Sequence, residues 1–340
     1  MRFLIFFITF LILSTWSFSQ NNCVENLKKA EDAFDAGRIE EIPALLNSCI
    51  RSDFDKEQKA LAYRLLTITY LYDKDEEKAE EAMLHLLRTD PLFKPDISND
   101  PSEFISLYNS FRTNPIMIAG FSVGGMLFYI RDVSRFGVEN LTSETEKYSG
   151  NWGVDLGFDV EIPVKKNWSV YSSLHFSSKK YSIENTLMSF NELQVNESQS
   201  WVDLYLMGQY NFTEMKTRPF IRLGGYAGSL ISAQAVYLTN QEDLNDIEGP
   251  SEDITQLRTT FNYGWVGDLG LSHSFGRNII DLTLRYCYVF KNYVNEESRG
   301  GPLENSLALT YGYRDNDFQA NFMSATIGYK IMIFKPKKLY

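Results

Sequence analysis

Apolar residues recur every three to four positions from about residue 22 to 112, and this spacing predicts α-helices. Leu27, Ala30 and Phe34 form one apolar stripe, and three further stripes follow before Pro91 ends the pattern. A last helix is expected from Pro101 to Arg112. We therefore predict an N-terminal α-helical domain, built from two helix pairs, over residues 20–112.

From Pro115 onward apolar and polar residues alternate, which predicts β-strands. Eight extended segments run over residues 115–130, 149–162, 167–180, 199–213, 217–233, 259–275, 278–292 and 316–334. Tight turns at 163–166, 214–216 and 276–277 alternate with long polar connections at 131–148, 181–198, 234–258 and 293–315. An even number of strands with this alternation is typical of outer-membrane barrels. We predict an eight-stranded antiparallel transmembrane β-barrel over residues 113–340.

The two faces of each predicted strand differ in polarity. In the second strand Trp152, Leu156 and Phe158 share one face, and Asp155 and Asp159 lie on the other. A barrel in lipid turns the apolar face outward, whereas a soluble sandwich or lipocalin-like barrel turns it inward. Aromatic residues near the segment ends are typical of the interfacial girdles of membrane barrels, so the pattern favours lipid.

The polar faces then line a narrow lumen, because an eight-stranded barrel is just wide enough inside for its own side chains. Arg285 and Arg222 are the expected partners of Asp268 and Asp281. We predict a structural network that packs the lumen, and a narrow conductance path is the alternative. The predicted network consists of Asp155, Asp159, Glu161, Lys179, Asp203, Arg222, Asp268, Asp281, Arg285 and Lys330.

The N-terminal segment "MRFLIFFITFLILSTWSFSQ" is the one long apolar block of the chain. Arg2 precedes an apolar core that is too short to span a bilayer comfortably, and the small residues Ser17 and Ser19 suit cleavage before Gln20. We therefore predict a cleaved signal peptide over residues 1–19. An uncleaved membrane anchor is the alternative.

The chain is acidic, with a formal net charge of −11 and an isoelectric point near 4.9, which argues against a nucleic-acid partner. Residues 22–112 hold 12 Lys and Arg against 19 Asp and Glu, a net charge of −7. This acidic surface is either merely solvated or a docking face for a basic partner.

Cys23 and Cys49 fall near the start of the first predicted helix and the end of the second. Antiparallel helices bring these ends together, so we expect a disulfide once the chain has reached an oxidising compartment. Two free buried thiols are the alternative.

No catalytic set is found in the sequence, and we expect neither an enzyme nor a cofactor. His85 lies on a predicted helix, His273 lies near a turn, and His175 is expected in the lumen, where a neighbouring aspartate leaves a barrel-mouth hydrolase as an alternative. No Cys and His set has zinc spacing, so no metal site is expected. One acidic loop is retained as a calcium candidate, although its spacing differs from the helix–loop–helix calcium loop. Its carboxylates are Glu242, Asp243, Asp246, Glu248, Glu252 and Asp253.

A helix-pair unit followed by "DPLFKPDISNDPSEFISLYNSFR" and then "PIMIAGFSVGGMLFYI" resembles envelope proteins of the Bacteroidota. In these proteins a periplasmic domain similar to tetratricopeptide repeats leads into a PorT-like or OmpA-like outer-membrane barrel. The residues that carry the resemblance are Asp90, Pro91, Phe93, Lys94, Pro95, Asp96, Asp100, Pro101, Glu103 and Phe104. The resemblance implies a periplasmic helical domain and membership among secretion and gliding accessory proteins or their unassigned relatives. The even number of strands also leaves both ends of the barrel on the side of the short turns, which is the periplasm in outer-membrane barrels, so we expect the long loops to be extracellular.

The expected function is that of an interaction or scaffold protein in the outer membrane. Its helical domain would dock envelope or secretion-machinery proteins, since helix-pair repeats form concave binding surfaces. Its other expected partners are outer-membrane lipid and lipopolysaccharide. A small channel or an accessory transport subunit is the main alternative function, and the hydrolase is the third.

Overall fold

The computed structural model describes residues 20–52, 54–134, 147–187, 191–213, 215–241 and 247–339. The predicted signal segment therefore lies outside the described residues. The chain forms two compact units, which are described separately: Met1–Pro115 together with Phe334–Tyr340, and Ile116–Ile333. The sequence pattern did not indicate that the C-terminal tail belongs to the helical unit. No helix in the described ranges is long and apolar enough to cross a membrane.

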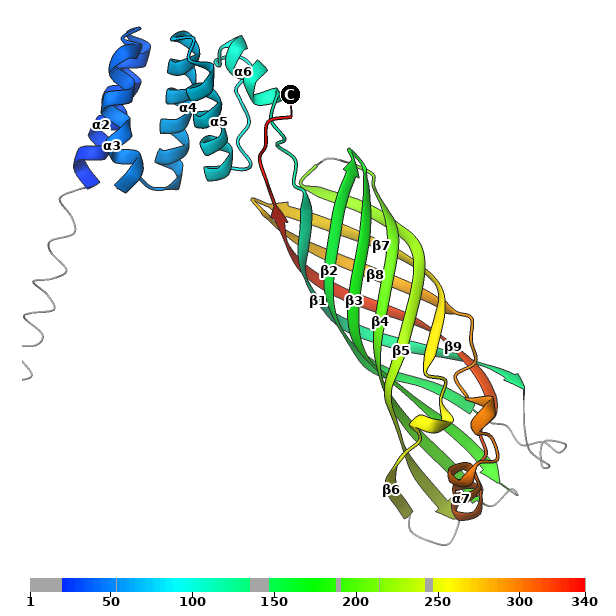
Figure 1. The fold of residues 1–340 in the computed structure, drawn as a ribbon. Coiled ribbons are helices and arrows are strands. Elements are labelled where there is room, and N and C mark those ends of the chain that lie inside the picture. The colour runs from blue at the N-terminus through cyan, green and yellow to red at the C-terminus, as the bar shows by residue number, and fades with distance from the viewer. Residues whose placement is uncertain are drawn as a thin grey trace, which may run out of the picture. The chain divides into compact units, whose positions relative to one another are not determined.

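The helical unit consists mainly of α2 (Gln20–Asp35), α3 (Ile42–Ser52), α4 (Lys56–Tyr72), α5 (Glu76–Thr89) and α6 (Ser102–Asn109), with a short 3₁₀ turn at Ile39–Glu41 (Figure 1). Carboxylates set the starts of two helices. The Asp55 side chain accepts from the Gln58 backbone N–H, and the Gln58 side chain accepts from the Asp55 N–H in return, which forms a capping box for α4. Asp75 caps α5 in the same way by accepting from the Lys78 backbone.

The helices pack as antiparallel pairs. Cys23 near the start of α2 forms a disulfide with Cys49 near the end of α3. In the second pair, the ring of Tyr63 on α4 stacks on His85 of α5, with 5.1 Å between the ring centroids. Ala30, Ile42 and other fully buried apolar side chains fill the space between the helices. The predicted stripes therefore lie in or against the core, except that Tyr72, which the spacing of Leu61, Leu65 and Ile68 placed on the third stripe, is exposed.

The "DP…DP" motif closes the end of this helix stack. Phe93 packs edge-on against Phe104 and Tyr108, and the Tyr108 hydroxyl donates to the Phe93 carbonyl at 2.9 Å. The buried Asp100 carboxylate accepts from the Arg64 guanidinium and from the Asp96 backbone N–H. The motif therefore has a structural role in the helical unit.

Replacing both Cys23 and Cys49 by serine is expected to lower the free energy of unfolding of the helical unit by about 3 kcal/mol, because the cross-link restricts the unfolded chain over a separation of 26 residues. The helical circular-dichroism signal of the full-length protein in detergent micelles, followed on heating, measures this loss. Cys287→Ser, which changes a free buried cysteine of the barrel, is the matched control. Identical helix melting in the double variant and the wild-type protein would contradict the prediction.

The second unit is a closed antiparallel barrel with a ring of eight strands. These are β1 (Met117–Ser134), β2 (Lys147–Lys165), β3 (Trp168–Leu187), β4 (Asn191–Asn211), β5 (Thr217–Gln241), β7 (Phe261–Phe275), β8 (Asn278–Val289) and β9 (Asp317–Ile333) (Figure 1). Each ring strand pairs with the next ring strand along the chain, so that β5 pairs with β7. The pairing of β1 with β9 closes the ring. The eight predicted strands are thus present.

Three of the predicted long connections, 181–198, 234–258 and 293–315, differ from the structure. Strands β3 and β4 remain paired out to Leu187 and Asn191, so most of residues 181–198 is sheet. Strand β5 runs on to Gln241, where β6 (Ile247–Asp253) pairs with it outside the ring. A helix, α7 (Pro302–Tyr311), occupies part of the predicted loop at 293–315. The strands were underestimated because their outer face becomes polar beyond the apolar segment.

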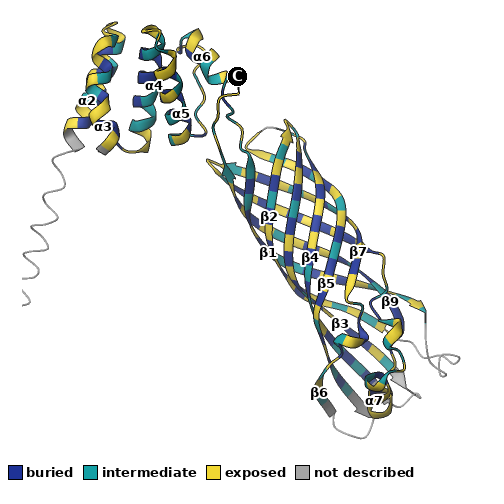
Figure 2. Ribbon diagram, in the orientation of Figure 1, coloured by how far each residue is buried: buried dark blue, intermediate teal, exposed yellow. Residues whose placement is uncertain are grey.

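The polarity of the two faces inverts along the same strands. In the half near the tight turns, exposed Leu204 and Leu206 of β4 alternate with buried Asp203 and Gln209. Toward the long connections, buried Leu193 and Val195 of β4 alternate with the polar, partly exposed Gln194 and Asn196. Buried and exposed positions alternate along the barrel strands (Figure 2). The first half has the facing of a barrel in lipid, and the second has the facing of a soluble barrel with an apolar core. We call the apolar outer surface of the first half the lipid belt.

Candidate functional site

The side chains of the predicted lumen network all lie inside the barrel and are at most 6% exposed. They come from several strands, because inward positions of neighbouring strands face each other across an eight-stranded lumen. Most of them are held by ion pairs or hydrogen bonds to other lumen side chains. Burial of these charges is compatible with folding because partners satisfy them.

Asp268 and Asp281 lie at the centre of this network. The Arg285 guanidinium donates to both carboxylate oxygens of Asp268, with Nε–Oδ1 at 2.9 Å and Nη2–Oδ2 at 3.0 Å. Arg222 lies between the two aspartates, 3.5 Å from Asp268 and 3.3 Å from Asp281. Lys330 completes the group by pairing with Asp281. The two arginines expected from the sequence are thus the partners, and Arg222 is shared.

His175 lies in the middle of the lumen and is 1% exposed. Its Nδ1 is 2.7 Å from Asp155 Oδ1, and its Nε2 faces Asp159 at 3.5 Å and Arg285 at 3.5 Å. Both ring nitrogens of this buried histidine are therefore engaged by other lumen side chains. His85 and His273 lie elsewhere, on α5 and on the outer face of β7, so the histidines do not combine.

Lys179 and Asp203 form the next layer toward the long connections. Lys179 Nζ is 3.2 Å from Asp203 Oδ1 and lies 4.4 Å from the centre of the Trp201 ring. The Tyr226 hydroxyl donates to Asp203 at 2.9 Å. Aromatic rings therefore surround this pair and exclude water, which strengthens the interaction of the two charges.

A second group of charges, which sequence reasoning missed, closes the other half of the lumen. Arg258 is 1% exposed and donates to Glu197 at 2.6 Å and to Asp315 at 2.7 Å. We call these three residues the arginine clamp. Tyr313 donates to Asp315, and Gln199 donates to Glu197. Val195, Glu197 and Gln199 occupy every second position, and this spacing could have indicated a strand with these side chains on one face. Val195 and Glu197, however, lay in the predicted connection 181–198.

The acidic calcium candidate shows no metal site among the residues that the structure describes. Glu242, Asp243 and Asp246 lie outside the described residues, as does the side chain of Glu248. The Asp253 carboxylate accepts from the Thr255 hydroxyl and backbone N–H, and these hydrogen bonds lower the pKa of Asp253. In addition, Glu252 and Asp253 belong to β6 and its pairing with β5 rather than to a loop.

The helical unit carries an acidic groove of about 580 Å³. The C-terminal tail enters it as a short extended segment: the Arg112 N–H donates to the Lys337 carbonyl, the Leu339 N–H donates to the Ser110 carbonyl, and Lys338 pairs with Glu80. A backbone hydrogen bond at the start of α6 and a hydrogen bond from Ser102 lower the pKa of the groove residue Glu103. The groove is lined by Leu71, Glu76, Glu80, Ser102, Glu103, Ser106, Leu107, Ser110 and Lys338.

Comparison with solved structures finds other barrels of the outer membrane. Ail, the attachment invasion locus protein of Yersinia pestis, is 10% identical in sequence, with a TM-score of 0.30. The match covers 64% of this chain and 99% of the Ail chain. OprG of Pseudomonas aeruginosa is 11% identical, with a TM-score of 0.36 and coverages of 65% and 97%. The translocator domain of the autotransporter NalP of Neisseria meningitidis is 9% identical, with a TM-score of 0.27 and coverages of 78% and 99%. No curated protein matches the chain.

A protein-family comparison matches residues 118–295 to the outer membrane protein beta-barrel domain. The match covers more than half of the chain and falls within the unit that closes into the ring of eight strands. It accounts for the apolar outer surface and the charged interior of that unit, and it supports an outer-membrane location. The chain belongs to the family of outer membrane proteins with this beta-barrel domain.

Proposed function

We propose that this protein is an outer-membrane anchor whose helical unit docks a basic segment of an envelope or secretion-machinery protein. The observation that carries the proposal is the acidic groove, which already holds a lysine of the chain's own tail beside Glu80. In this proposal Lys338 occupies the position that a basic residue of the partner would take. The partner would compete with the tail for the groove.

The antiparallel pairing of α2 with α3 and of α4 with α5 supports a tetratricopeptide-like helical unit. Both ends of the barrel segment, Met117 and Ile333, pair with each other at the end that carries the tight turns. In outer-membrane barrels the short turns face the periplasm, so we assign the helical unit to the periplasm and the long connections to the outside. The resemblance to Bacteroidota envelope proteins agrees with this orientation.

The packed lumen supports an anchoring role for the barrel over a transport role. Arg285, Arg222 and Lys330 are engaged with aspartates across the lumen, and the arginine clamp closes the other half. An ion that crossed this barrel would have to separate several buried ion pairs, each costly to break. We likewise assign no enzymatic activity to the barrel, because both ring nitrogens of the buried His175 are engaged by lumen side chains.

Reversing the charge of the groove is expected to abolish partner binding. A photo-crosslinking side chain at Leu107 of the full-length protein, in native envelopes, should form a discrete adduct with one envelope protein. Glu76→Lys combined with Glu103→Lys should reduce that adduct about tenfold, because like charges would face the basic partner. Glu40→Lys combined with Glu57→Lys, exposed positions on the same unit outside the groove, is the matched control.

Equal adduct yields from the groove variant and the control variant would contradict the proposal. Stable ion-sized conductance steps from the purified protein in planar bilayers would contradict the anchoring role and favour the channel.

A further inference from the structure

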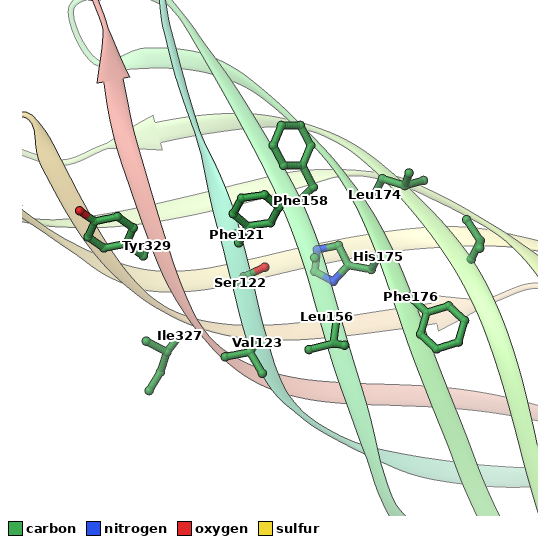
Figure 3. Close-up of a pocket in the computed structure, with 12 residues that line it drawn as sticks. Phe121, Ser122, Val123, Leu156, Phe158, Leu174, His175, Phe176, Ile327 and Tyr329 are labelled. Carbon is green, nitrogen blue, oxygen red and sulfur yellow. The ribbon is translucent and has the colours of Figure 1, made fainter.

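The lipid belt carries a groove that the proposed docking function does not use. Two rows of apolar side chains cross the barrel wall from β9 to β3, and the inward-facing row that contains Ser122, Gly157 and His175 forms the floor between them (Figure 3). Phe121 and Phe158 stand in one row, and Val123, Leu156 and Phe176 stand in the other. The cavity of about 700 Å³ lies within the range of small-ligand pockets, which is about 300–1,000 Å³.

The groove climbs across the wall toward the end with the long connections. In the row that ends at Val202, Ile327 of β9 lies six residues before Ile333, the last residue of β9 at the tight-turn end. Val202, at the other end of the groove, lies nine residues before Asn211, where β4 reaches its tight turn. The groove therefore runs obliquely through the lipid belt toward the long connections. An acyl chain of a lipid in the leaflet on that side would take this direction.

Hydroxyl groups surround the upper end of the groove. Val202 pairs with Ser229 of β5, and the next outward-facing positions on β3 and β4 are Ser178 and Ser200, which pair with each other. One row farther from the belt, Lys180 is exposed and lies opposite Asn151 and Ser198. The apolar groove thus leads to a patch of hydroxyl and amide groups that includes one positively charged side chain. We call Ser178, Ser200, Ser229 and Lys180 the headgroup patch.

We propose that the groove and the headgroup patch together form a binding site for a phosphorylated saccharide lipid of the lipid A type. One acyl chain lies between the two apolar rows, the sugar hydroxyls hydrogen-bond to the serines, and a phosphate pairs with Lys180. A charged hydrogen bond between a lysine and a phosphate is stronger than a neutral one. The choice of an outer-leaflet glycolipid rests on the proposed orientation, with the long connections outside.

Native mass spectrometry of the full-length protein in detergent micelles tests the site. With lipid A added in slight excess, one lipid per barrel is expected to remain bound. Val123→Trp, which fills the groove, is expected to lower the retained fraction about tenfold, and Lys180→Glu several-fold. Leu284→Trp, on the outer face of β8, and Lys291→Glu, at the end of the same strand, are the matched controls and should retain lipid normally.

Two results would overturn the site. Retention of phosphatidylethanolamine equal to that of lipid A would show only ordinary annular lipid on the wall. Retention unchanged by Val123→Trp would place the bound lipid elsewhere. The assay requires neither the acidic groove nor a protein partner, so failure of the docking function leaves this test unaffected.

Discussion

Replacing Asp268 by alanine is expected to destabilise the barrel by about 3–5 kcal/mol, the cost of leaving a buried charge without its partner. Arg285 donates to both oxygens of Asp268, and Arg222 also faces this carboxylate, so the substitution leaves two guanidinium groups short of negative charge. Because the lumen is inaccessible, water cannot replace the lost hydrogen bonds without local opening.

Urea unfolding of the barrel in phospholipid vesicles, followed by tryptophan fluorescence, measures this effect. Leu269→Ala is the matched control, since its side chain is adjacent in sequence, 61% exposed and on the lipid belt. The double variant Asp268→Ala/Arg285→Leu should recover part of the loss, because it removes one of the unpaired charges. Equal and small effects of Asp268→Ala and Leu269→Ala would contradict the stabilising role of the Asp268 ion pairs, and a large loss in Leu269→Ala alone would mean that the strand faces the other way.

Replacing Arg258 by leucine is the second change with a large expected effect, again about 3–5 kcal/mol. It leaves the carboxylates of Glu197 and Asp315 together and buried without a cation. The arginine clamp ties the segment before β7 to β4 and to the segment before β9. Its loss should therefore open the half of the barrel near the long connections first.

Limited chymotrypsin digestion of the folded protein in micelles should show this opening as new cleavage at Leu and Tyr residues in the region that holds β6 and α7. The triple variant Arg258→Leu/Glu197→Leu/Asp315→Leu should restore much of the resistance, since apolar replacement of a whole buried ion group is often neutral. Arg131→Leu is the matched control, because Arg131 is exposed and donates to the side chain of Gln319. A clamp variant as resistant as the control would contradict this role.

The inversion of polarity explains which parts of the fold were predictable. Along β4, the outward residues from Val202 to Phe212 are mainly apolar, and the alternation there located the strand. Beyond Ser200 the outward residues become polar while Val195 and Leu193 turn inward. The sequence analysis expected apolar residues on the outer face of every strand. Residues 181–198 have polar outward residues, so they were wrongly assigned to a loop.

The sequence by itself determined the two-unit organisation, the number of ring strands and the inward direction of the lumen charges. Each of these follows from local periodicity, since a strand has a period of two and a helix a period of 3.6. Residues two positions apart in a strand point to the same face of the sheet. Asp268 and Asp281 face inward because their neighbours at this spacing also face inward.

Only the tertiary structure decided which charges meet. That Arg222 pairs with both Asp268 and Asp281 depends on the stagger of β5 against β7 and β8, and this stagger comes from closing the whole ring. The same holds for the arginine clamp and for Lys338 in the acidic groove, whose partners are 57 to 258 residues away in the chain. Contacts over such separations arise from the closed ring and the folded helix stack, and no local pattern encodes them.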